Sequence, residues 1–391
     1  MKVLGMISGT SHDGIDAALV DFRLDGDTLR GSLLDDGTTP YDPALRARLR
    51  AVLPPAATPL AEVCALDTLI GQAFADVAGG VTDRHPGVDA VTSHGQTVFH
   101  WVEGAHALGT LQLGQPAWIA ERTGASVVSD VRTRDIAVGG HGAPLVSILD
   151  ILLLGSFPGV SAALNLGGIS NMTVIDGGTA RSAHDIGPAN ALLDAVVAAD
   201  PEFPGGYDDG GKIAATGTVD ETLLAVFLDE PYYALPTPKS TGKELFHLEY
   251  VRAAIERSGR HPATADLLAT LTELTAATVA RDVLAAGCDR VVASGGGCRN
   301  PHLLGRLAAA LGDVAIMTTD ELGAPADTKE AIAFALIGWC TMHGLPGNVT
   351  AATGAGAQRV LGTITPGRGP LALPPHLDAL PRSLVLERGW A

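Results

Sequence analysis

The 391-residue sequence has few cysteines and few basic side chains for its length. Its four cysteines lie far apart and form no Cys-x-x-Cys pair, so their spacing matches neither a zinc site nor the disulfide framework of a small secreted protein. Its 26 lysines and arginines are outnumbered by 43 aspartates and glutamates, which gives a formal net charge of −17. This charge argues against a nucleic-acid partner or an anionic membrane, since both call for a basic surface.

Long apolar runs and targeting signals are also missing. The apolar run 143–154 is interrupted by Pro144, Ser147 and Asp150, so it does not have the length that a membrane span requires. The first residues, MKVLGMIS, lack the apolar core and the small-residue cleavage site of a signal peptide. We therefore expect a soluble, cytoplasmic protein whose cysteines are reduced.

The residues that are present favour an α/β protein with two or three domains, because the chain is long and 46 % of it is hydrophobic. Short apolar runs that end in turn residues predict strands at 88–94, 125–131, 161–167 and 289–297. Apolar residues at helical spacing predict helices over 265–287 and 327–344. Strands that alternate with helices in this way are typical of mixed sheets covered by helices.

The opening segment GMISGTSHDGID (5–16) places glycines, hydroxyl side chains and two aspartates between two apolar runs. Asp-Gly between strand-like runs is typical of a β-hairpin. The same small residues also suit a phosphate-binding turn, because the backbone can approach phosphates closely and a carboxylate can act through Mg²⁺. The residues of this segment alone leave both interpretations open.

Two later segments resemble the opening one in design. The segment SAALNLGGISNMTVID (161–176) repeats its order of apolar strand, small polar turn and apolar strand, and VVASGGGCRNPHLL (291–304) adds a strand, three glycines and a helix start. Backbone amides at such a junction favour phosphates. The three segments in this order indicate a two-domain actin-like ATPase fold of the actin, sugar-kinase and Hsp70 type, with a cleft between the domains. We expect a first domain over 1–140, with 345–391 as a candidate addition, and a second domain over 141–344.

Motifs spread over nearly the whole chain resemble those of the anhydro-N-acetylmuramic acid kinase family. They are GMISGTSHDGID (5–16), SHGQTVFH (93–100), GTLQLGQPAWIA (109–120), DVRTRDIAVGGHGAPL (130–145), NLGGISNMT (165–173), HDIGPAN (184–190), PTPKSTGKELF (236–246), SGGGCRNP (294–301) and TKEAIAFA (328–335). The resemblance implies a phosphotransferase of peptidoglycan recycling that uses ATP and water to open the 1,6-anhydro ring of anhydro-N-acetylmuramic acid. Its products would be N-acetylmuramic acid 6-phosphate and ADP.

Two other functions are alternatives to this one. Another sugar or acid kinase of the same fold is the main alternative, because a fold does not determine a substrate. A non-catalytic ATP-binding protein of the actin or Hsp70 type would need a partner-binding extension, and no region of the sequence resembles one. The sequence departs from the family pattern at Ile7, His12, His141, Ile186 and Ala189. Of these, His141 and Ile186 flank expected substrate positions, so they bear on sugar specificity.

The resemblance also implies roles for single residues. Asp185 matches the catalytic aspartate that activates water for attack on the anomeric carbon, whereas its sequence context alone favours a helix N-cap. Arg132 matches a substrate-binding residue, and its guanidinium suits the lactyl carboxylate of the sugar. Glu330 and His94 match positions on the substrate side. The loop PTPKSTGKELF (236–246) lacks the spacing of a Walker loop and is expected on the substrate side or at an interface.

ATP is expected at two turns rich in small residues. The residues concerned are Gly9, Thr10, Ser11, His12, Asp13, Gly14, Ile15 and Asp16 in the first turn, and Gly295, Gly296 and Gly297 in the second. The first turn is expected to hold the β- and γ-phosphates, with Asp13 or Asp16 holding Mg²⁺ through water. The direct metal ligands stay unassigned. ATP and the anhydro sugar are the expected partners, and a homodimer is left open.

Overall fold

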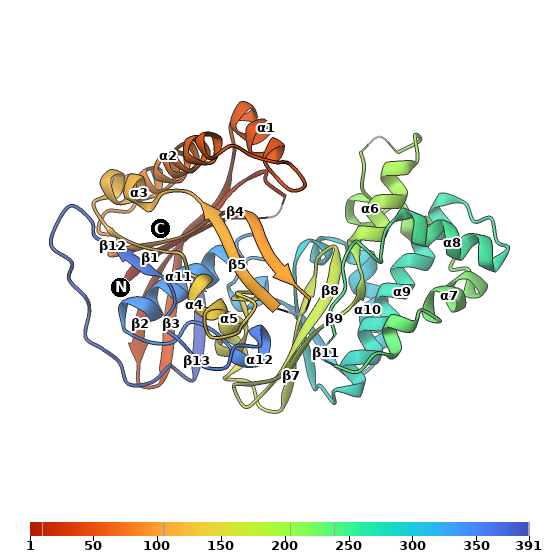
Figure 1. Cartoon of the computed structure of the whole chain (residues 1–391). Helices are drawn as coiled ribbons and strands as arrows, with labels where there is room; N and C mark the ends of the chain where they lie inside the picture. The colour runs from red at the N-terminus through yellow and green to blue at the C-terminus, as the bar shows by residue number, and fades with distance from the viewer. Residues whose placement is uncertain (10, 105, 204, 238, 390–391) are drawn as a thin grey trace. The chain divides into compact units, whose positions relative to one another are not determined.

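The computed structural model describes the chain except residues 10, 105, 204, 238 and 390–391. The chain forms two compact units, one made of Met1–Ser156 with Leu322–Ala391 and the other of Phe157–Glu321. The domain limits expected at residues 140 and 344 differ from these limits. The main reason is helix α11 (Lys329–Met342), which packs against strands of the first unit although it follows the second unit in sequence (Figure 1).

The first unit is built on one mixed sheet. Its strands are β1 (Lys2–Ser8), β2 (Gly14–Asp25), β3 (Thr28–Pro40), β4 (Ala90–Glu103), β5 (His106–Leu113), β6 (Ser126–Ser129), β12 (Thr363–Thr365) and β13 (Ser383–Arg388). The strand order is β12-β6-β4-β1-β2-β3-β13, with β5 paired to β4. Strands β1, β2 and β3 are antiparallel neighbours, whereas β4 is parallel to β1 and β6 is parallel to β4.

The second unit repeats this arrangement in a smaller sheet. Its strands are β7 (Val160–Leu166), β8 (Ile169–Asp176), β9 (Thr179–Pro188), β10 (Arg290–Ser294) and β11 (Ala315–Thr318), in the order β11-β10-β7-β8-β9. Strands β7, β8 and β9 are antiparallel neighbours, β10 is parallel to β7, and β11 is parallel to β10. The prediction of an α/β fold with two related actin-like cores, each opening with a hairpin, is therefore confirmed.

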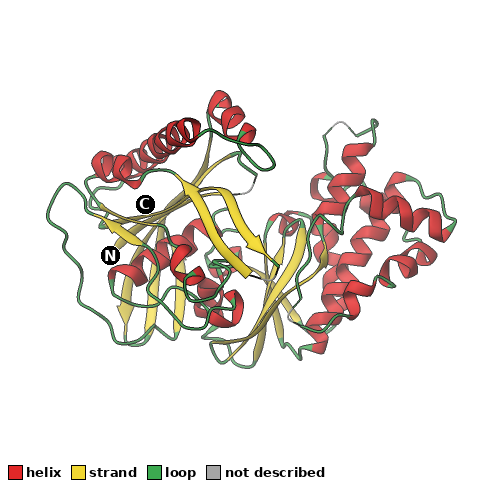
Figure 2. Cartoon of the chain, viewed as in Figure 1, coloured by secondary structure: helices red, strands yellow, loops and turns green. Residues whose placement is uncertain are grey.

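Alternation along the strands explains why helices cover both faces of the first sheet (Figure 2). Ala17 and Leu19 of β2 join a core with helices α2 (Leu60–Arg84) and α3 (Pro116–Thr123), while Ala18 and Val20 join a core with α5 (Ser147–Leu154) and α11. This is the period of two expected for a strand that is buried on both faces. The remaining helices of this unit are α1 (Pro43–Ala51), α4 (Thr133–Ile136) and α12 (Thr350–Thr353).

Gly5 of β1 lets α11 approach the sheet closely. A Cβ atom at Gly5 would lie 2.0 Å from the carbonyl oxygen of Ala331, and one at Gly338 would lie within 1.7 Å of the Thr92 hydroxyl oxygen. Larger side chains at either position would force the helix away from the strands. The first glycine of the opening motif is therefore required by packing of α11.

The second unit has a helical layer beside its sheet. Helices α9 (Thr264–Ala285) and α10 (Pro301–Leu311) share an apolar core with β7 and β8. A second core joins α9 to α6 (Asn190–Ala199), α7 (Glu221–Leu228) and α8 (Leu248–Ser258), which cluster in Figure 1. Short 3₁₀ turns occur at η1 (Asp209–Gly211), η2 (Ala214–Thr216), η3 (Pro231–Ala234), η4 (Gly296–Arg299) and η5 (Asp320–Leu322). In the described ranges, none of the helices is long and apolar enough to cross a membrane.

Candidate active site

The opening turn is a hairpin loop held by one buried glutamine. The Ser8 hydroxyl lies 2.6 Å from Gln96 Oε1 and 2.7 Å from the Gly14 carbonyl oxygen, and Gln96 Nε2 donates to the Gly9 carbonyl oxygen at 3.2 Å. His12 has a left-handed backbone (φ 53°), and its carbonyl oxygen accepts from Arg46 Nε at 2.8 Å. These contacts confirm the β-hairpin and order the turn, and Thr10 lies outside the described residues.

The two inner glycines of this turn have different structural demands. A Cβ atom at Gly14 would lie 2.5 Å from the Thr39 carbonyl oxygen, so strand pairing alone requires glycine there. A Cβ atom at Gly9 would meet only Ser11 Oγ, at 3.9 Å. Packing therefore does not require glycine at residue 9. Ile15 is buried in the core, so only its backbone can face a ligand.

The two aspartates of the turn lie near each other. Ser11 Oγ donates to Asp13 Oδ1 at 2.6 Å, and Thr38 Oγ1 donates to Asp16 Oδ1 at 2.5 Å. Burial raises the pKa of Asp16, the Thr38 hydrogen bond opposes this, and the nearby charge of Asp13 adds to it. Within the described residues no three acidic, histidine or cysteine side chains form a metal cluster. Carboxylates are ligands that Mg²⁺ accepts, and two of them lie in this turn.

The glycines after β10 are only partly explained by packing. Gly295 has a left-handed φ of 86°, and a Cβ atom there would lie 2.5 Å from Asn165 Oδ1. A Cβ atom at Gly297 would lie 2.6 Å from Leu166 Cβ, whereas one at Gly296 would meet nothing among the described atoms within 4 Å. Packing against β7 therefore accounts for Gly295 and Gly297. Gly296 is the position of this turn that stays open to a ligand.

Arg132 follows β6 and is held on two sides. Its Nε donates to His94 Nε2 at 2.6 Å, and its Nη1 donates to the Gly142 carbonyl oxygen at 2.5 Å. Burial lowers the pKa of Arg132, while the negative charges of Glu330 and Asp135 oppose that shift. Arg132 is therefore a half-buried guanidinium held by hydrogen-bonded protein groups.

His94 lies on β4 and accepts a hydrogen bond from Arg132. It is 3 % exposed, and its ring packs against Phe334 of α11 with centroids 4.8 Å apart. Its Nδ1 lies 2.9 Å from the Gly95 carbonyl oxygen. Burial, and then the positive charge of Arg132, lower the pKa of His94 well below its ordinary value. Both ring nitrogens are therefore engaged by protein groups.

Glu330 is the third candidate in this part of the first unit. It lies in the first turn of α11 and is accessible to solvent, yet many protein atoms surround it. Burial by these atoms raises the pKa of Glu330. The positive charge of Arg132 opposes this rise, and the negative charge of Asp16 adds to it. Glu330 is therefore close enough to Arg132 and Asp16 for their charges to act on it, although the three residues lie far apart in the sequence.

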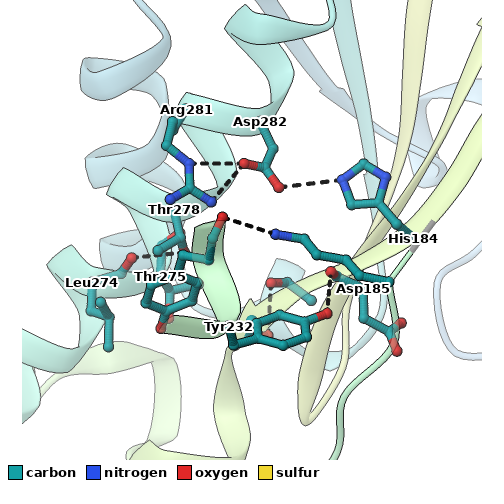
Figure 3. A network of polar contacts seen from close by, with 12 residues as sticks. His184, Asp185, Tyr232, Leu274, Thr275, Thr278, Arg281 and Asp282 are labelled. Carbon is teal, nitrogen blue, oxygen red and sulfur yellow. Dashed lines mark hydrogen bonds and ion pairs between the residues drawn. The ribbon is translucent and has the colours of Figure 1, made fainter. Parts of the chain in front are cut away.

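Asp185 lies in the second unit, on β9, and is held by the loop after η3. Asp185 Oδ2 accepts from Ser240 Oγ at 2.8 Å and from the Thr241 backbone N–H at 3.0 Å. The Tyr232 hydroxyl donates to the Asp185 carbonyl oxygen at 2.7 Å (Figure 3), and the Asp185 N–H donates to the Lys239 carbonyl oxygen at 3.0 Å. The N-cap interpretation of Asp185 is wrong, because α6 begins at Asn190 with Ala189 as its N-cap.

The side chain of the neighbouring residue His184 points toward Asp282 of α9 (Figure 3). His184 Nε2 lies 3.2 Å from Asp282 Oδ2, and Arg281 donates twice to Asp282 Oδ1, at 2.8 and 2.9 Å (Figure 3). Burial alone would raise the pKa of Asp282, but the hydrogen bonds from His184 and Arg281 lower it overall. Successive side chains of a strand point to opposite faces. This explains why His184 joins β9 to α9 while Asp185 meets the loop.

Sequence reasoning missed several of these partners. These partners lie in or beside the motifs quoted above, but nothing in their spacing indicated which residues they would contact. They are Gln96, Gly142, Tyr232, Ser240 and Thr241. Among the departures from the family pattern, Ile186 and Ala189 are buried in the core, with exposures of 0 % and 1 %. His141 is exposed, and its N–H donates to the Thr353 carbonyl oxygen at 2.8 Å.

The chain resembles solved structures at low sequence identity. Among solved structures, the chain is similar to an activator of the 2-hydroxyisocaproyl-CoA dehydratase from Clostridium difficile with bound ADPNP (12 % identity, 87 % of this chain and 94 % of that one, TM-score 0.39). It is also similar to a ROK family glucokinase from Streptomyces griseus in complex with glucose and AMPPNP (15 % identity, 86 % and 97 %, TM-score 0.37).

The relatives by sequence are much more similar. Proteins named anhydro-N-acetylmuramic acid kinase from Rhodococcus erythropolis and Streptomyces avermitilis are 51 % and 54 % identical to the chain, over 99 % of this chain and 100 % of each relative. The sequence profile of the family described as anhydro-N-acetylmuramic acid kinase matches residues 1–367. The chain therefore belongs to the anhydro-N-acetylmuramic acid kinase family.

Proposed function

We propose that this protein is an ATP-dependent anhydro-N-acetylmuramic acid kinase of peptidoglycan recycling. The observation that carries the proposal is the match to the family over residues 1–367, together with relatives of that name that are 51–54 % identical over nearly the whole chain. In this reaction, water adds to the anomeric carbon of the anhydro sugar and the bond from that carbon to the 6-oxygen breaks. The 6-oxygen takes the γ-phosphoryl group, and ADP leaves.

Asp185 is proposed as the general base that takes a proton from the attacking water. Its Oδ2 is occupied by the donors of Ser240 and Thr241. Its Oδ1 has no hydrogen-bond donor among the described residues, so this oxygen has lone pairs available for a water proton. Two donors on one oxygen hold the carboxylate in one orientation, and the other oxygen could then reach the proton of a nearby water.

Arg132 and Glu330 are proposed as substrate-binding residues, and His94 as a residue of the same region. Arg132 is oriented by protein acceptors at Nε and Nη1, which suits recognition of the lactyl carboxylate. Glu330 has a raised pKa, and a carboxyl group of this kind can hydrogen-bond with sugar hydroxyl or amide groups. These contacts would distinguish the anhydro amino sugar from neutral hexoses.

The nucleotide is proposed to bind at Gly9–Asp16 and Gly295–Gly297. The open side of Gly9 and of Gly296 supports this assignment, since a phosphate must approach the backbone closely. Mg²⁺, when bound, neutralises charge on the β- and γ-phosphates, and Asp13 or Asp16 would hold it through water. We also propose a cytoplasmic location, where ATP is available. We propose a homodimer as the oligomeric state, and light scattering would test it.

One assay tests the proposed reaction directly. The purified protein is incubated with ATP, Mg²⁺ and anhydro-N-acetylmuramic acid in ¹⁸O-labelled water, and the product is analysed by mass spectrometry. We expect a product with one phosphate and one labelled oxygen at the anomeric carbon, formed in equal amount to ADP. Phosphorylation of another sugar or acid, with no product from the anhydro sugar, would instead support the alternative kinase.

A further inference from the structure

His94 and Arg132 form one contact within a longer chain of buried hydrogen bonds in the first unit. Its first link is the His94 ring, which is 3 % exposed and packed on Phe334. Its Nδ1 lies 2.9 Å from the Gly95 carbonyl oxygen. A carbonyl oxygen can only accept, so Nδ1 carries the ring proton and Nε2 has the lone pair.

This tautomer makes His94 an acceptor for Arg132. Arg132 Nε donates to His94 Nε2 at 2.6 Å, and an arginine stays protonated and can only donate. A protonated imidazole could not accept this bond, and it would place a second positive charge beside the guanidinium. The lowered pKa of His94, caused by burial and by Arg132, is consistent with the neutral ring.

The opposite side of the guanidinium is held by a loop that makes further hydrogen bonds. Arg132 Nη1 donates to the Gly142 carbonyl oxygen, and the Gly142 N–H donates to Asp135 Oδ2 at 2.8 Å. Asp135 is 0 % exposed, and its Oδ1 accepts from Asn348 Nδ2 at 2.7 Å and from Thr353 Oγ1 at 2.8 Å. The acceptor on this side is therefore anchored to the C-terminal part of the unit.

We propose that His94 is a positioning residue that fixes the plane of the Arg132 guanidinium for the carboxylate of the sugar. With Nε and Nη1 held, Nη2 is the guanidinium nitrogen that has no acceptor in the described part of the chain. The histidine does not touch the substrate in this arrangement; it acts through Arg132. The inference rests on the proposed role of Arg132 in substrate binding, and it assigns His94 a different task from direct substrate contact.

Two substitutions at residue 94 separate the hydrogen bond from packing. His94→Gln can place its Oε1 near the position of Nε2, so an acceptor for Arg132 is retained. His94→Phe keeps a ring against Phe334 but presents only C–H groups to Arg132. For His94→Phe we expect the KM for the anhydro sugar to rise about 10- to 100-fold, the range for one hydrogen bond to a charged group. For His94→Gln we expect a KM within about threefold of the wild type, because the acceptor is kept.

The controls distinguish positioning from a general loss of structure. The KM for ATP and the melting temperature should stay near the wild-type values in both variants. In an Arg132→Ala background, His94→Phe should have no further effect on the sugar KM, because its effect passes through Arg132. If His94→Phe has a lower melting temperature than the wild type, His94→Leu replaces it in the test. Leucine is smaller and also lacks a hydrogen-bond acceptor.

Three results with the His94 variants would overturn the proposal. They are a folded acceptor-free variant with the wild-type sugar KM, an equal loss in His94→Gln and His94→Phe, and additive losses in the double variant. A wild-type sugar KM in Arg132→Ala would overturn it as well, by removing its premise. Wild-type turnover of the anhydro sugar, measured first, tests the proposed reaction separately from the role of His94.

Discussion

Ser240 Oγ donates to Asp185 Oδ2 at 2.8 Å, although the two residues are 55 positions apart in the chain. The Thr241 N–H donates to the same oxygen at 3.0 Å. The carboxylate is thus oriented by the loop that contains Ser240 and Thr241, and among the described residues these partners belong to no helix N-terminus. The Lys239–Thr241 segment therefore sets the orientation of Asp185.

Asp185→Asn tests the base itself. Asparagine can still accept hydrogen bonds from Ser240 and Thr241, so the melting temperature should change little, by an amount that corresponds to about 1 kcal/mol or less. It cannot take a proton from water, so turnover should fall by about 10²–10⁴-fold or more. The checks are the rate of sugar phosphorylation, the ATP affinity and the melting curve of one preparation. Near-normal turnover would leave Asp185 without a catalytic role.

Ser240→Ala tests the orientation of the base. One of two donors to Oδ2 is lost, so we expect kcat to fall roughly 2- to 10-fold while the KM for ATP is unchanged. Ser240 is exposed, so the stability of the fold should change by no more than about 0.5 kcal/mol. Ser240→Thr keeps a hydroxyl and serves as the matched control. If Ser240→Thr loses as much turnover as Ser240→Ala, the hydroxyl is not the reason.

Gly9→Val tests the opening turn as a phosphate site. The side chain would meet only Ser11 Oγ, at 3.9 Å from its Cβ, and Gly9 is not among the left-handed glycines, so the fold should be retained. We expect ATP affinity to fall at least 10-fold, about 1.4 kcal/mol, because the branched side chain fills the space that phosphates need. Gly305→Val, on an exposed and equally open site of α10, is the control, and isothermal titration with ATP and Mg²⁺ is the measurement. Equal affinities in the two variants would place the phosphates elsewhere.

Asp16→Asn tests the raised pKa of Asp16 by its effect on pH dependence. A carboxyl whose pKa is raised in the folded state binds more protons there than in the unfolded chain, so this group lowers stability as pH rises above about 4, the usual Asp range. Asp16→Asn should therefore make the ligand-free protein more stable than the wild type at neutral pH, with the difference vanishing at low pH. The same variant should bind ATP with Mg²⁺ more weakly. Melting curves from pH 4 to 8, with and without nucleotide, decide both points, and a difference that does not vary with pH would contradict the assignment.

The local features of this protein could be read from its sequence. The apolar runs at 161–167 and 289–297 predicted β7 and β10, and the periodic segments 265–287 and 327–344 predicted α9 and α11. The repeated hairpin design predicted two related sheets, which the matching strand orders confirm. These features depend on neighbours within a few residues, so hydrophobic period and turn chemistry are sufficient to predict them.

Only the tertiary structure decided which distant groups meet. It placed α11 in the first unit, paired Arg132 with His94 and Gly142, and gave Asp185 the donors of the 239–241 loop in place of a helix terminus. Each of these contacts joins residues that are distant in the sequence. The packing of whole sheets and helices, rather than local spacing, decides which residues meet. The sequence determined the elements, the family and the residue types available for chemistry. The side-chain partners followed from how those elements pack. A hydrogen bond requires its two heavy atoms to lie about 3 Å apart, and only packing brings distant residues that close.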